Sequence, residues 1–213
     1  MDIVYLGHSS FRIKGKTATV VTDPYDERCG KFPKDTAADI VTVSHDHEDH
    51  NQTKLVHGSS FIVHGPGEYE VKGVSIIGVH TWHDDKEGAE RGANTVYVIE
   101  MEGLRVCHLG DLGHKLTEGQ LEEIGSIDVV MMPVGGVYTI DAKTAVEVVK
   151  QLDPWVIIPM HFQTSELKLS NRLGTVAEFI KETGKTAQTL LKYVVSKDKL
   201  PTETTLIVLE KRS

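Results

Sequence analysis

Short apolar runs separated by glycine and polar residues alternate along the first half of the chain, and this pattern predicts β-strands joined by turns. The first three runs, at residues 3–6, 10–13 and 18–22, follow one another closely and suggest an antiparallel meander. Two longer runs are separated by a Glu102-Gly103 turn and predict a hairpin. The other strands predicted in this half lie at residues 39–43, 61–63, 71–79, 94–101 and 104–109.

The second half combines strands with amphipathic helices. Two continuous apolar runs, at residues 127–134 and 155–160, are typical of strands that are covered on both faces. Helices are predicted from a capping box and from apolar positions at helical spacing; they begin after Thr117 and cover residues 142–152 and 171–183. A last strand is predicted at residues 205–209, so periodicity alone indicates a mixed α/β protein.

Composition sets the size of the core. The chain has 213 residues and is 39% hydrophobic, which is enough for one well-packed domain but short for two domains. We therefore expect a single domain over residues 1–213. No apolar run approaches the roughly 18 residues that span a membrane, and no cleavable leader pattern is visible. We expect a soluble, cytoplasmic protein without a membrane partner, and the sequence leaves a homo-oligomer open.

The charge balance narrows the choice of partner. The formal net charge of -8 argues against a nucleic acid. A phosphorylated small molecule stays open, because bound cations would reverse the sign of the charge locally. Cys29 and Cys107 are far apart in the sequence, and we expect both to be free thiols in a reducing compartment.

The densest group of polar side chains follows the predicted strand at residues 39–43. The segment VSHDHEDHN at residues 43–51 contains three imidazoles and three carboxylates. His45 and His47, two residues apart in an extended loop, can reach one cation, and Asp49 and His50 can reach a second. Imidazole and carboxylate suit zinc, with manganese or iron as competitors. The simpler alternative is a solvated polar loop.

The segment SHDHEDH resembles the HxHxDH signature of the metallo-β-lactamase fold superfamily of binuclear metallohydrolases. Later segments follow in the expected order, so the resemblance covers nearly the whole chain. GHSSF, at residues 7–11, is similar to the N-terminal motif of a subgroup that includes ascorbate-6-phosphate lactonase and N-acyl phosphatidylethanolamine phospholipase D. The resemblance implies an α/β (α+β) fold of the αββα type: a four-layer sandwich with helices outside and a metal site along one edge.

The resemblance also implies the remaining metal ligands. A His at the end of a strand should complete the first site, and we prefer His80, which directly ends an apolar run, over His83. Asp111, in the motif GDLGH, is expected to bridge both ions, and His161 is expected to be the last ligand of the second. The implied set is therefore His45, His47 and His80 for the first ion, Asp49, His50 and His161 for the second, and Asp111 between them.

Four further residues are candidates for support of the metal site or for the cleft. Asp23 is expected to hold a metal-binding imidazole in place, although an Asp before Pro is also a common turn former. His8 is either a turn histidine bonded to nearby backbone or a polar group at the rim. The histidine not chosen at positions 80 and 83 would face the substrate or the surface, and His114 could line the cleft.

The expected chemistry is hydrolysis of a small-molecule ester, lactone or phosphodiester by a metal-activated bridging hydroxide. A divalent ion lowers the pKa of bound water from ~15.7 to roughly 7, and Asp49 would orient the nucleophile. Two alternatives remain. One is a di-iron oxidoreductase on the same fold, although its flavin-linked members resemble HxExDH and this chain has His47 at the middle position. The other is a metal-binding protein without turnover.

Overall fold

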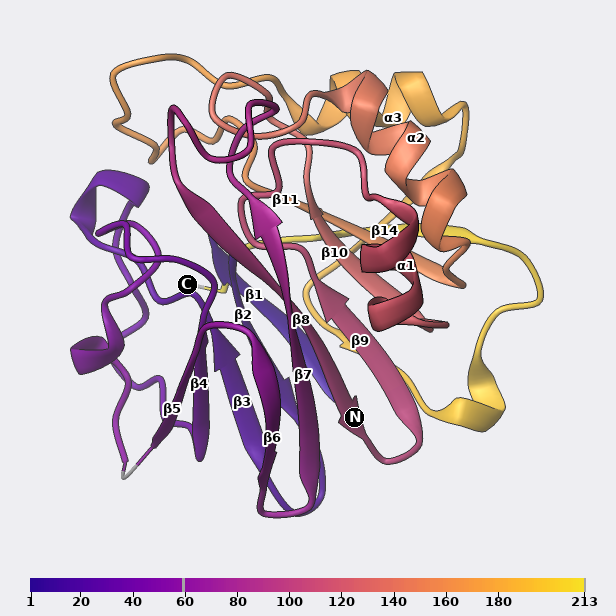
Figure 1. The fold of residues 1–213 in the computed structure, drawn as a ribbon. Coiled ribbons are helices and arrows are strands. Elements are labelled where there is room, and N and C mark those ends of the chain that lie inside the picture. Colours follow the sequence, from indigo (N-terminus) through magenta and orange to yellow (C-terminus); the bar gives the residue numbers. More distant parts are fainter. Residues whose placement is uncertain (59, 213) are drawn as a thin grey trace.

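The computed structural model describes residues 1–58 and 60–212, and two β-sheets pack face to face in it (Figure 1). The first sheet contains, in spatial order, β13 (Tyr193–Val194), β1 (Asp2–Gly7), β2 (Ser10–Lys14), β3 (Thr19–Thr22), β4 (Ile40–Val43) and β5 (Phe61–His64). The second contains β12 (Ala187–Leu190), β14 (Thr205–Leu209), β11 (Val156–Met160), β10 (Val129–Pro133), β9 (Leu104–His108), β8 (Ala93–Met101), β7 (Val74–Trp82) and β6 (Gly67–Val71).

The three α-helices lie against the second sheet (Figure 1), and they are α1 (Glu118–Ile124), α2 (Ala142–Leu152) and α3 (Val176–Thr183). Their buried side chains, such as Ala145 and Phe179, join the main hydrophobic core. None of the helices within residues 1–58 and 60–212 is long and apolar enough to cross a membrane. The predicted fold class, with two sheets and external helices, is confirmed.

The outer face of the first sheet is covered in another way. Loops and the 3₁₀ turns η1 (Glu27–Cys29) and η2 (Thr53–Leu55) lie over it, and a second apolar cluster forms beneath them. Within the described part of the chain, no α-helix covers this face. The connection between β3 and β4 contains Pro24, Gly30 and Pro33, and these residues prevent a regular helix.

The helix starts follow local capping signals. Thr117 and Gln120 form the predicted capping box of α1. The helix predicted at residues 171–183 begins later, at Val176, because Thr175 and Glu178 form a second capping box. The residues before it lie along the loop after β10 instead, where Gly174 N donates to Gly135 O at 2.7 Å.

The predicted strand at residues 71–79 is shifted in the structure. The turn-like sequence before it forms β6, which pairs with β7 as a hairpin. Strand β7 then continues past Val79, and its pairing with β8 extends from Ser75 opposite Glu100 to Trp82 opposite Ala93. Backbone pairing with β8, rather than the apolar run, therefore decides that β7 ends at Trp82. The short strands β12 and β13 were not predicted.

The strand directions bring several loops to the same edge. In the first sheet, β1 and β3 are both antiparallel to β2, and β3 is parallel to β4, so these three strands point the same way. In the second sheet, β7 and β9 are both antiparallel to β8, and β9, β10 and β11 are parallel. The polar residues of the predicted site follow the carboxyl ends of these strands, except His80, which lies within β7.

One tyrosine connects the two sheets beside this edge. The hydroxyl of Tyr97, on β8, donates to Val43 O at 2.8 Å and accepts from Gly65 N at 2.9 Å. Next to it, Thr95 N donates to Ser44 O at 2.8 Å. Burial raises the pKa of Tyr97 above its usual value, so the hydroxyl stays protonated and can donate. These bonds fix the start of the histidine-rich loop to the opposite sheet.

We predict that Tyr97→Phe lowers the free energy of unfolding by about 1–3 kcal/mol, because it leaves a buried carbonyl and an amide without a partner. Urea denaturation measures this change. Tyr193→Phe is the control, because its hydroxyl makes no hydrogen bond with the described residues; a change within about 0.5 kcal/mol is expected. Equal stabilities for Tyr97→Phe and the unmodified chain would contradict the bridging role.

Candidate metal centre

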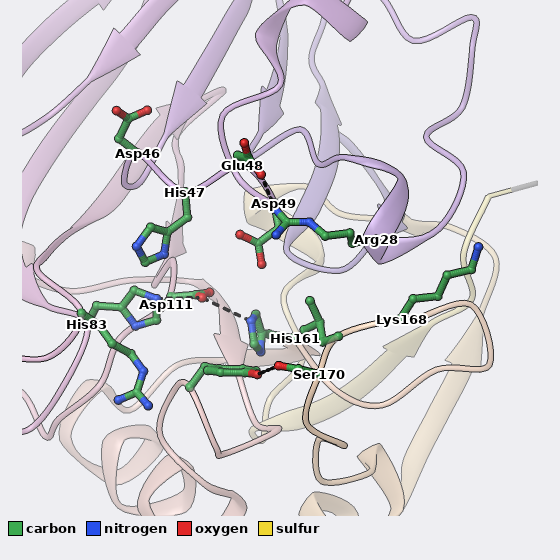
Figure 2. Close-up of a pocket in the computed structure, with 13 residues that line it drawn as sticks. Arg28, Asp46, His47, Glu48, Asp49, His83, Asp111, His161, Lys168 and Ser170 are labelled. Atoms are coloured by element: carbon green, nitrogen blue, oxygen red, sulfur yellow. Dashed lines mark hydrogen bonds and ion pairs between the residues drawn. The ribbon is translucent and has the colours of Figure 1, made fainter.

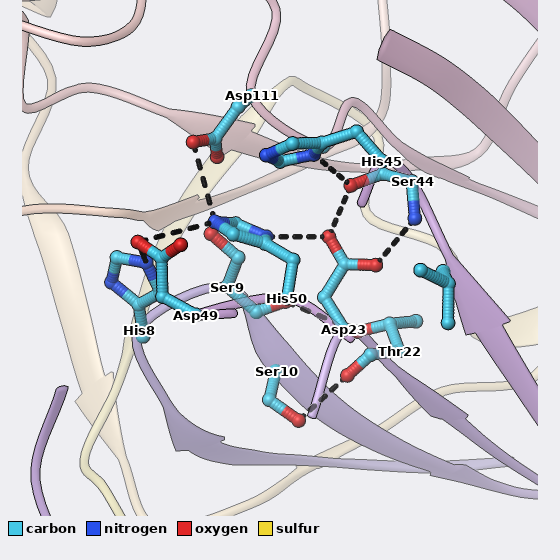
Figure 3. A network of polar contacts seen from close by, with 12 residues as sticks. His8, Ser9, Ser10, Thr22, Asp23, Ser44, His45, Asp49, His50 and Asp111 are labelled. Carbon is cyan, nitrogen blue, oxygen red and sulfur yellow. Dashed lines mark hydrogen bonds and ion pairs between the residues drawn. The ribbon is translucent and has the colours of Figure 1, made fainter. Parts of the chain in front are cut away.

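A buried carboxylate, Asp111, lies among three imidazoles that come from different strands. Its Oδ2 atom is 3.3 Å from His83 Nε2 and 3.2 Å from His161 Nε2 (Figure 2), and it is 3.3 Å from His50 Nε2 (Figure 3). His50 lies in the loop after β4, His83 follows β7, and His161 follows β11. The ends of both sheets therefore meet at this carboxylate.

The backbone holds Asp111 in place. Asp111 N donates to Asn94 Oδ1 at 2.9 Å, and Asn94 in turn donates to Leu109 O at 3.0 Å. Gly110, between them, has a φ of 55°, and a Cβ atom there would lie 2.4 Å from Asn94 Oδ1. A residue larger than glycine would thus push Asn94 away from the Asp111 amide.

The histidine rings form two groups that both adjoin Asp111. One group consists of His45, His47 and His83, and the other of His8, His50 and His161; within each group the potential ligand atoms lie within 4.8 Å of one another. Asp49 lies beside the second group, with Oδ2 at 3.9 Å from His50 Nε2. All the expected ligands except His80 are thus brought together.

The buried donor atoms of this site suit metal ions. Unpaired buried polar atoms are costly, and folded proteins contain few of them. Several nevertheless occur here without a hydrogen-bond partner among the described residues: His45 Nε2, His50 Nε2, His83 Nδ1, His161 Nδ1, both ring nitrogens of His8, and Asp111 Oδ1. Imidazole nitrogens and carboxylate oxygens are the donors that zinc and similar ions take, so the residues present fit such a group.

Burial also prepares several rings to bind a cation. It lowers the pKa of His8 to about 4, that of His45 well below its usual value, and that of His47 below its usual value. These rings are therefore neutral near pH 7 and have a free lone pair. Burial opposes the charged form of His50 too, but Asp111 and Asp23 raise its pKa overall. This negative environment favours a positive charge at the centre.

Asp23 orients rings from both groups (Figure 3). Its Oδ2 lies 2.9 Å from His50 Nδ1 and accepts a hydrogen bond from Ser44 Oγ at 2.5 Å, while Oδ1 accepts from Ser44 N at 2.8 Å. Ser44 Oγ is also 2.9 Å from His45 Nδ1. Burial would raise the pKa of Asp23, but His108 and His50 lower it, so the carboxylate is ionised. The structure thus places Asp23 against a histidine of the site, as expected.

The preference for His80 is corrected by the structure. His80 lies within β7, is exposed, and packs its ring on Trp82 with the centroids 4.2 Å apart. His83 is buried and is the first residue after the strand, next to His45 and His47. The error has a physical cause: the apolar run stops at Val79, but pairing with β8 carries the strand three residues further.

Neither His8 nor His114 lies at the rim or in the lining of the cleft, where the sequence analysis had considered them. His8 lies inside the site rather than at its rim, with Nε2 at 3.4 Å from Asp49 Oδ2. His114 accepts a hydrogen bond from Trp82 N at 3.0 Å and so supports the end of β7, one residue before His83. It does not line the cavity in front of the two histidine groups.

A cavity of about 740 Å³ opens in front of these side chains (Figure 2). Besides site residues, its lining includes four side chains that sequence reasoning missed: Arg28, Arg91, Tyr138 and Lys168. They come from four separate loops and form no recognisable motif, so only the fold reveals them. Arg28 forms an ion pair with Glu48 at 3.1 Å, and Arg91 lies over the Tyr138 ring at 5.7 Å.

Both cysteines are free, as expected. The structure adds that Cys29 Sγ lies within 4.8 Å of potential ligand atoms of His8 and Asp49. Burial raises the pKa of Cys29, so the group is a protonated thiol at neutral pH. Its position next to the site had no signal in the sequence.

Comparison with known proteins identifies the family. The profile of the Beta-lactamase superfamily domain matches residues 2–161. A UPF0173 metal-dependent hydrolase of Thermococcus onnurineus (strain NA1) is 30% identical over 192 residues, which cover 77% of this chain and 85% of the relative. A crystal structure from Thermotoga maritima, described provisionally as a Zn-dependent hydrolase of the metallo-beta-lactamase superfamily, matches with a TM-score of 0.82 and 40% identity and covers 99% of both chains.

A more distant structure shows how widely the fold is used. CmlA, a diiron beta-hydroxylase from Streptomyces venezuelae, has a TM-score of 0.63 and 12% identity, with 92% of this chain and 54% of that chain covered, and the likeness is one of fold alone.

The present chain belongs to the metallo-β-lactamase superfamily and, within it, to the UPF0173 metal-dependent hydrolases. It is accordingly a metal-dependent hydrolase.

We predict that Asp23→Asn weakens metal binding by roughly 10- to 100-fold, because an amide nitrogen cannot accept the hydrogen bonds that orient His50 and Ser44. Titration of the apoprotein with Zn²⁺ against a chelator of known affinity measures the change. Asp198→Asn, at an exposed position in the 3₁₀ turn η3 (Lys197–Lys199), is the control and should bind metal normally. Unchanged affinity in Asp23→Asn would show that this carboxylate does not support the ligands.

Proposed function

We propose that the chain is a binuclear metal-dependent hydrolase that acts on a small anionic ester, lactone or phosphodiester. The observation that carries this proposal is the presence of two groups of imidazoles, all buried except His47, on either side of the Asp111 carboxylate and next to an open cavity. Two sites that share a carboxylate are suited to two ions that act on the same substrate bond.

The first ion would be bound by His45, His47 and His83, and the second by Asp49, His50 and His161, with Asp111 between them. Zinc suits these donors, and manganese or iron would compete for them. When bound, the ions would supply water activated at neutral pH and would polarise the bond to be cleaved. The side chains position these ions, and Asp23 and Asn94 keep the ligands in their orientation.

Asp49 is the residue proposed to act in proton transfer. It lines the cavity, and its side chain is 18% exposed, whereas that of Asp111 is 3% exposed. Burial would raise the pKa of Asp49, but His8 and His50 lower it below its usual value, so it is an ionised acceptor at neutral pH. From this position Asp49 can accept a hydrogen bond from a water molecule in the cavity and orient it toward the substrate.

The cavity lining supports an anionic substrate. Arg28, Arg91 and Lys168 line it, and Lys168 has no ion-pair partner among the described residues. A phosphate or carboxylate could pair with this ammonium while the bond to be cleaved faces the histidines. The similarity of GHSSF to the motif of ascorbate-6-phosphate lactonase and N-acyl phosphatidylethanolamine phospholipase D supports substrates of the same class.

We predict that Asp49→Ala lowers kcat by at least about 100-fold while the fold persists, because it removes the proposed proton acceptor together with one ligand of the second ion. The measurement uses chromogenic phosphodiesters, esters and lactones, with the metal content determined on the same samples. Glu122→Ala, which changes an exposed acid of α1 outside the cavity lining, should retain most of the activity.

The outcomes of the substrate panel separate the candidate functions. Turnover that is lost after chelation and restored by zinc or manganese supports the hydrolase. Iron as the native metal, together with reduction of oxygen or nitric oxide, would support a di-iron oxidoreductase instead of a hydrolase. Two bound ions without turnover of any member of the panel would favour a metal-binding protein. Full activity of Asp49→Ala in buffer stripped of metals would contradict the assignment of that residue.

The charge of the substrate has its own test. We predict that Lys168→Glu raises the KM for an anionic phosphodiester, bis(4-nitrophenyl) phosphate, by roughly tenfold and leaves the KM for the neutral ester 4-nitrophenyl acetate nearly unchanged. Lys150→Glu, near the end of α2 and outside the cavity lining, makes the same change of charge and serves as the control. An equal effect of both variants on both substrates would contradict an anion-binding role for Lys168.

A further inference from the structure

We infer that His8 is itself a ligand of the second metal ion, which gives this ion a fifth protein side chain in addition to Asp49, His50, His161 and Asp111. The inference rests on the two-ion site proposed above. It concerns a residue outside the HxHxDH, GD and terminal His motifs, in the turn between β1 and β2.

The position of the His8 ring, beside Asp49 and His50, supports this role (Figure 3). The His8 ring centroid is 4.4 Å from that of His161 and 4.9 Å from that of His50, and ligand atoms of the three rings lie within 4.8 Å of one another. His8 Nε2 is 3.4 Å from Asp49 Oδ2. Three imidazoles and a carboxylate therefore enclose one small volume, as the ligands of a single ion do.

The His8 ring has no other partner that would explain its burial. Its side chain is fully buried, and neither Nδ1 nor Nε2 makes a hydrogen bond with the described residues. The distance to Asp49 is longer than that of an ordinary hydrogen bond. A buried histidine with a structural role would instead bond to a backbone carbonyl, as His108 at the end of β9 does with Ser9 O at 2.7 Å. A ligand role would satisfy one of the two free nitrogens.

The backbone around His8 is fixed by hydrogen bonds and by an uncommon conformation. His8 has a φ of 53°, which residues other than glycine seldom adopt. Its carbonyl accepts hydrogen bonds from His161 N at 3.0 Å and from the Tyr5 hydroxyl at 2.9 Å. The bond from His161 N joins two residues of the same proposed ligand set, so the two rings are placed relative to each other by the main chain.

A fifth protein ligand would also influence the choice of metal. Zinc sites are usually four-coordinate, whereas manganese and iron accept six ligands. The second site, with five side chains and room for water from the cavity, would then retain manganese or iron better than the first site does. The two positions would differ in their metal preference although both are rich in histidine.

The experiment compares metal-loaded protein with the variant His8→Asn, in which asparagine retains the left-handed backbone but is too short to reach the ion. We expect the affinity for the second ion to fall by roughly 10- to 100-fold or more. The visible absorption of the Co²⁺-loaded protein should change as well, since it responds to the number of ligands. His80→Ala is the control and should keep both ions and the same spectrum.

A structure of the manganese- or zinc-loaded protein tests the inference without a variant that could fold poorly. A His8 ring nitrogen at about 2.0–2.3 Å from the second ion supports it. A ring nitrogen beyond bonding distance, or a His8→Asn variant with unchanged stoichiometry and Co²⁺ spectrum, overturns it. Failure of the two-ion site gives a different result, because the unmodified protein would then bind fewer than two ions. Failure of hydrolysis alone would leave two bound ions without turnover, and the His8 measurements do not depend on turnover.

Discussion

The structure depends on the convergence of three imidazoles on the Asp111 carboxylate. A buried carboxylate is costly unless compensating groups surround it, and His50, His83 and His161 approach it from the ends of three strands in two sheets. This contact is made only if β4, β7, β9 and β11 all end at the same edge. The pairing of the strands and the chemistry of the site therefore impose the same constraint on the chain.

The bonds that join the two sheets lie next to the site they create. Tyr97 and Thr95 connect β8 to the start of the histidine-rich loop, and His161 N donates to His8 O across the gap between β11 and β1. His8, Asp23 and His161 all have positive φ angles, a conformation that non-glycine residues adopt at a cost. Backbone strain thus gathers where ligands are presented, and the cores beneath the sheets stabilise it.

Membership of a fold family does not by itself decide the reaction, because function resides in the side chains of the site. In this chain the donor atoms suit a metal-dependent hydrolase, and the basic side chains that line the cavity support the proposal of an anionic substrate. Arg28, Arg91 and Lys168 reach the cavity from loops that cover different parts of the two sheets. The proposed metal ligands follow strand ends, whereas the proposed substrate contacts come from loops between elements.

The sequence by itself determined the features that depend on local spacing. His45, His47, Asp49 and His50 are close in the chain, so one turn brings them together, and the capping box at Thr117 and the Glu102-Gly103 turn also act over a few residues. Only the tertiary structure decided between His80 and His83, placed His8 inside the site and brought Lys168 to the cavity. These outcomes depend on strand register and on contacts between distant segments, and long-range pairing of this kind leaves no periodic signal in the sequence.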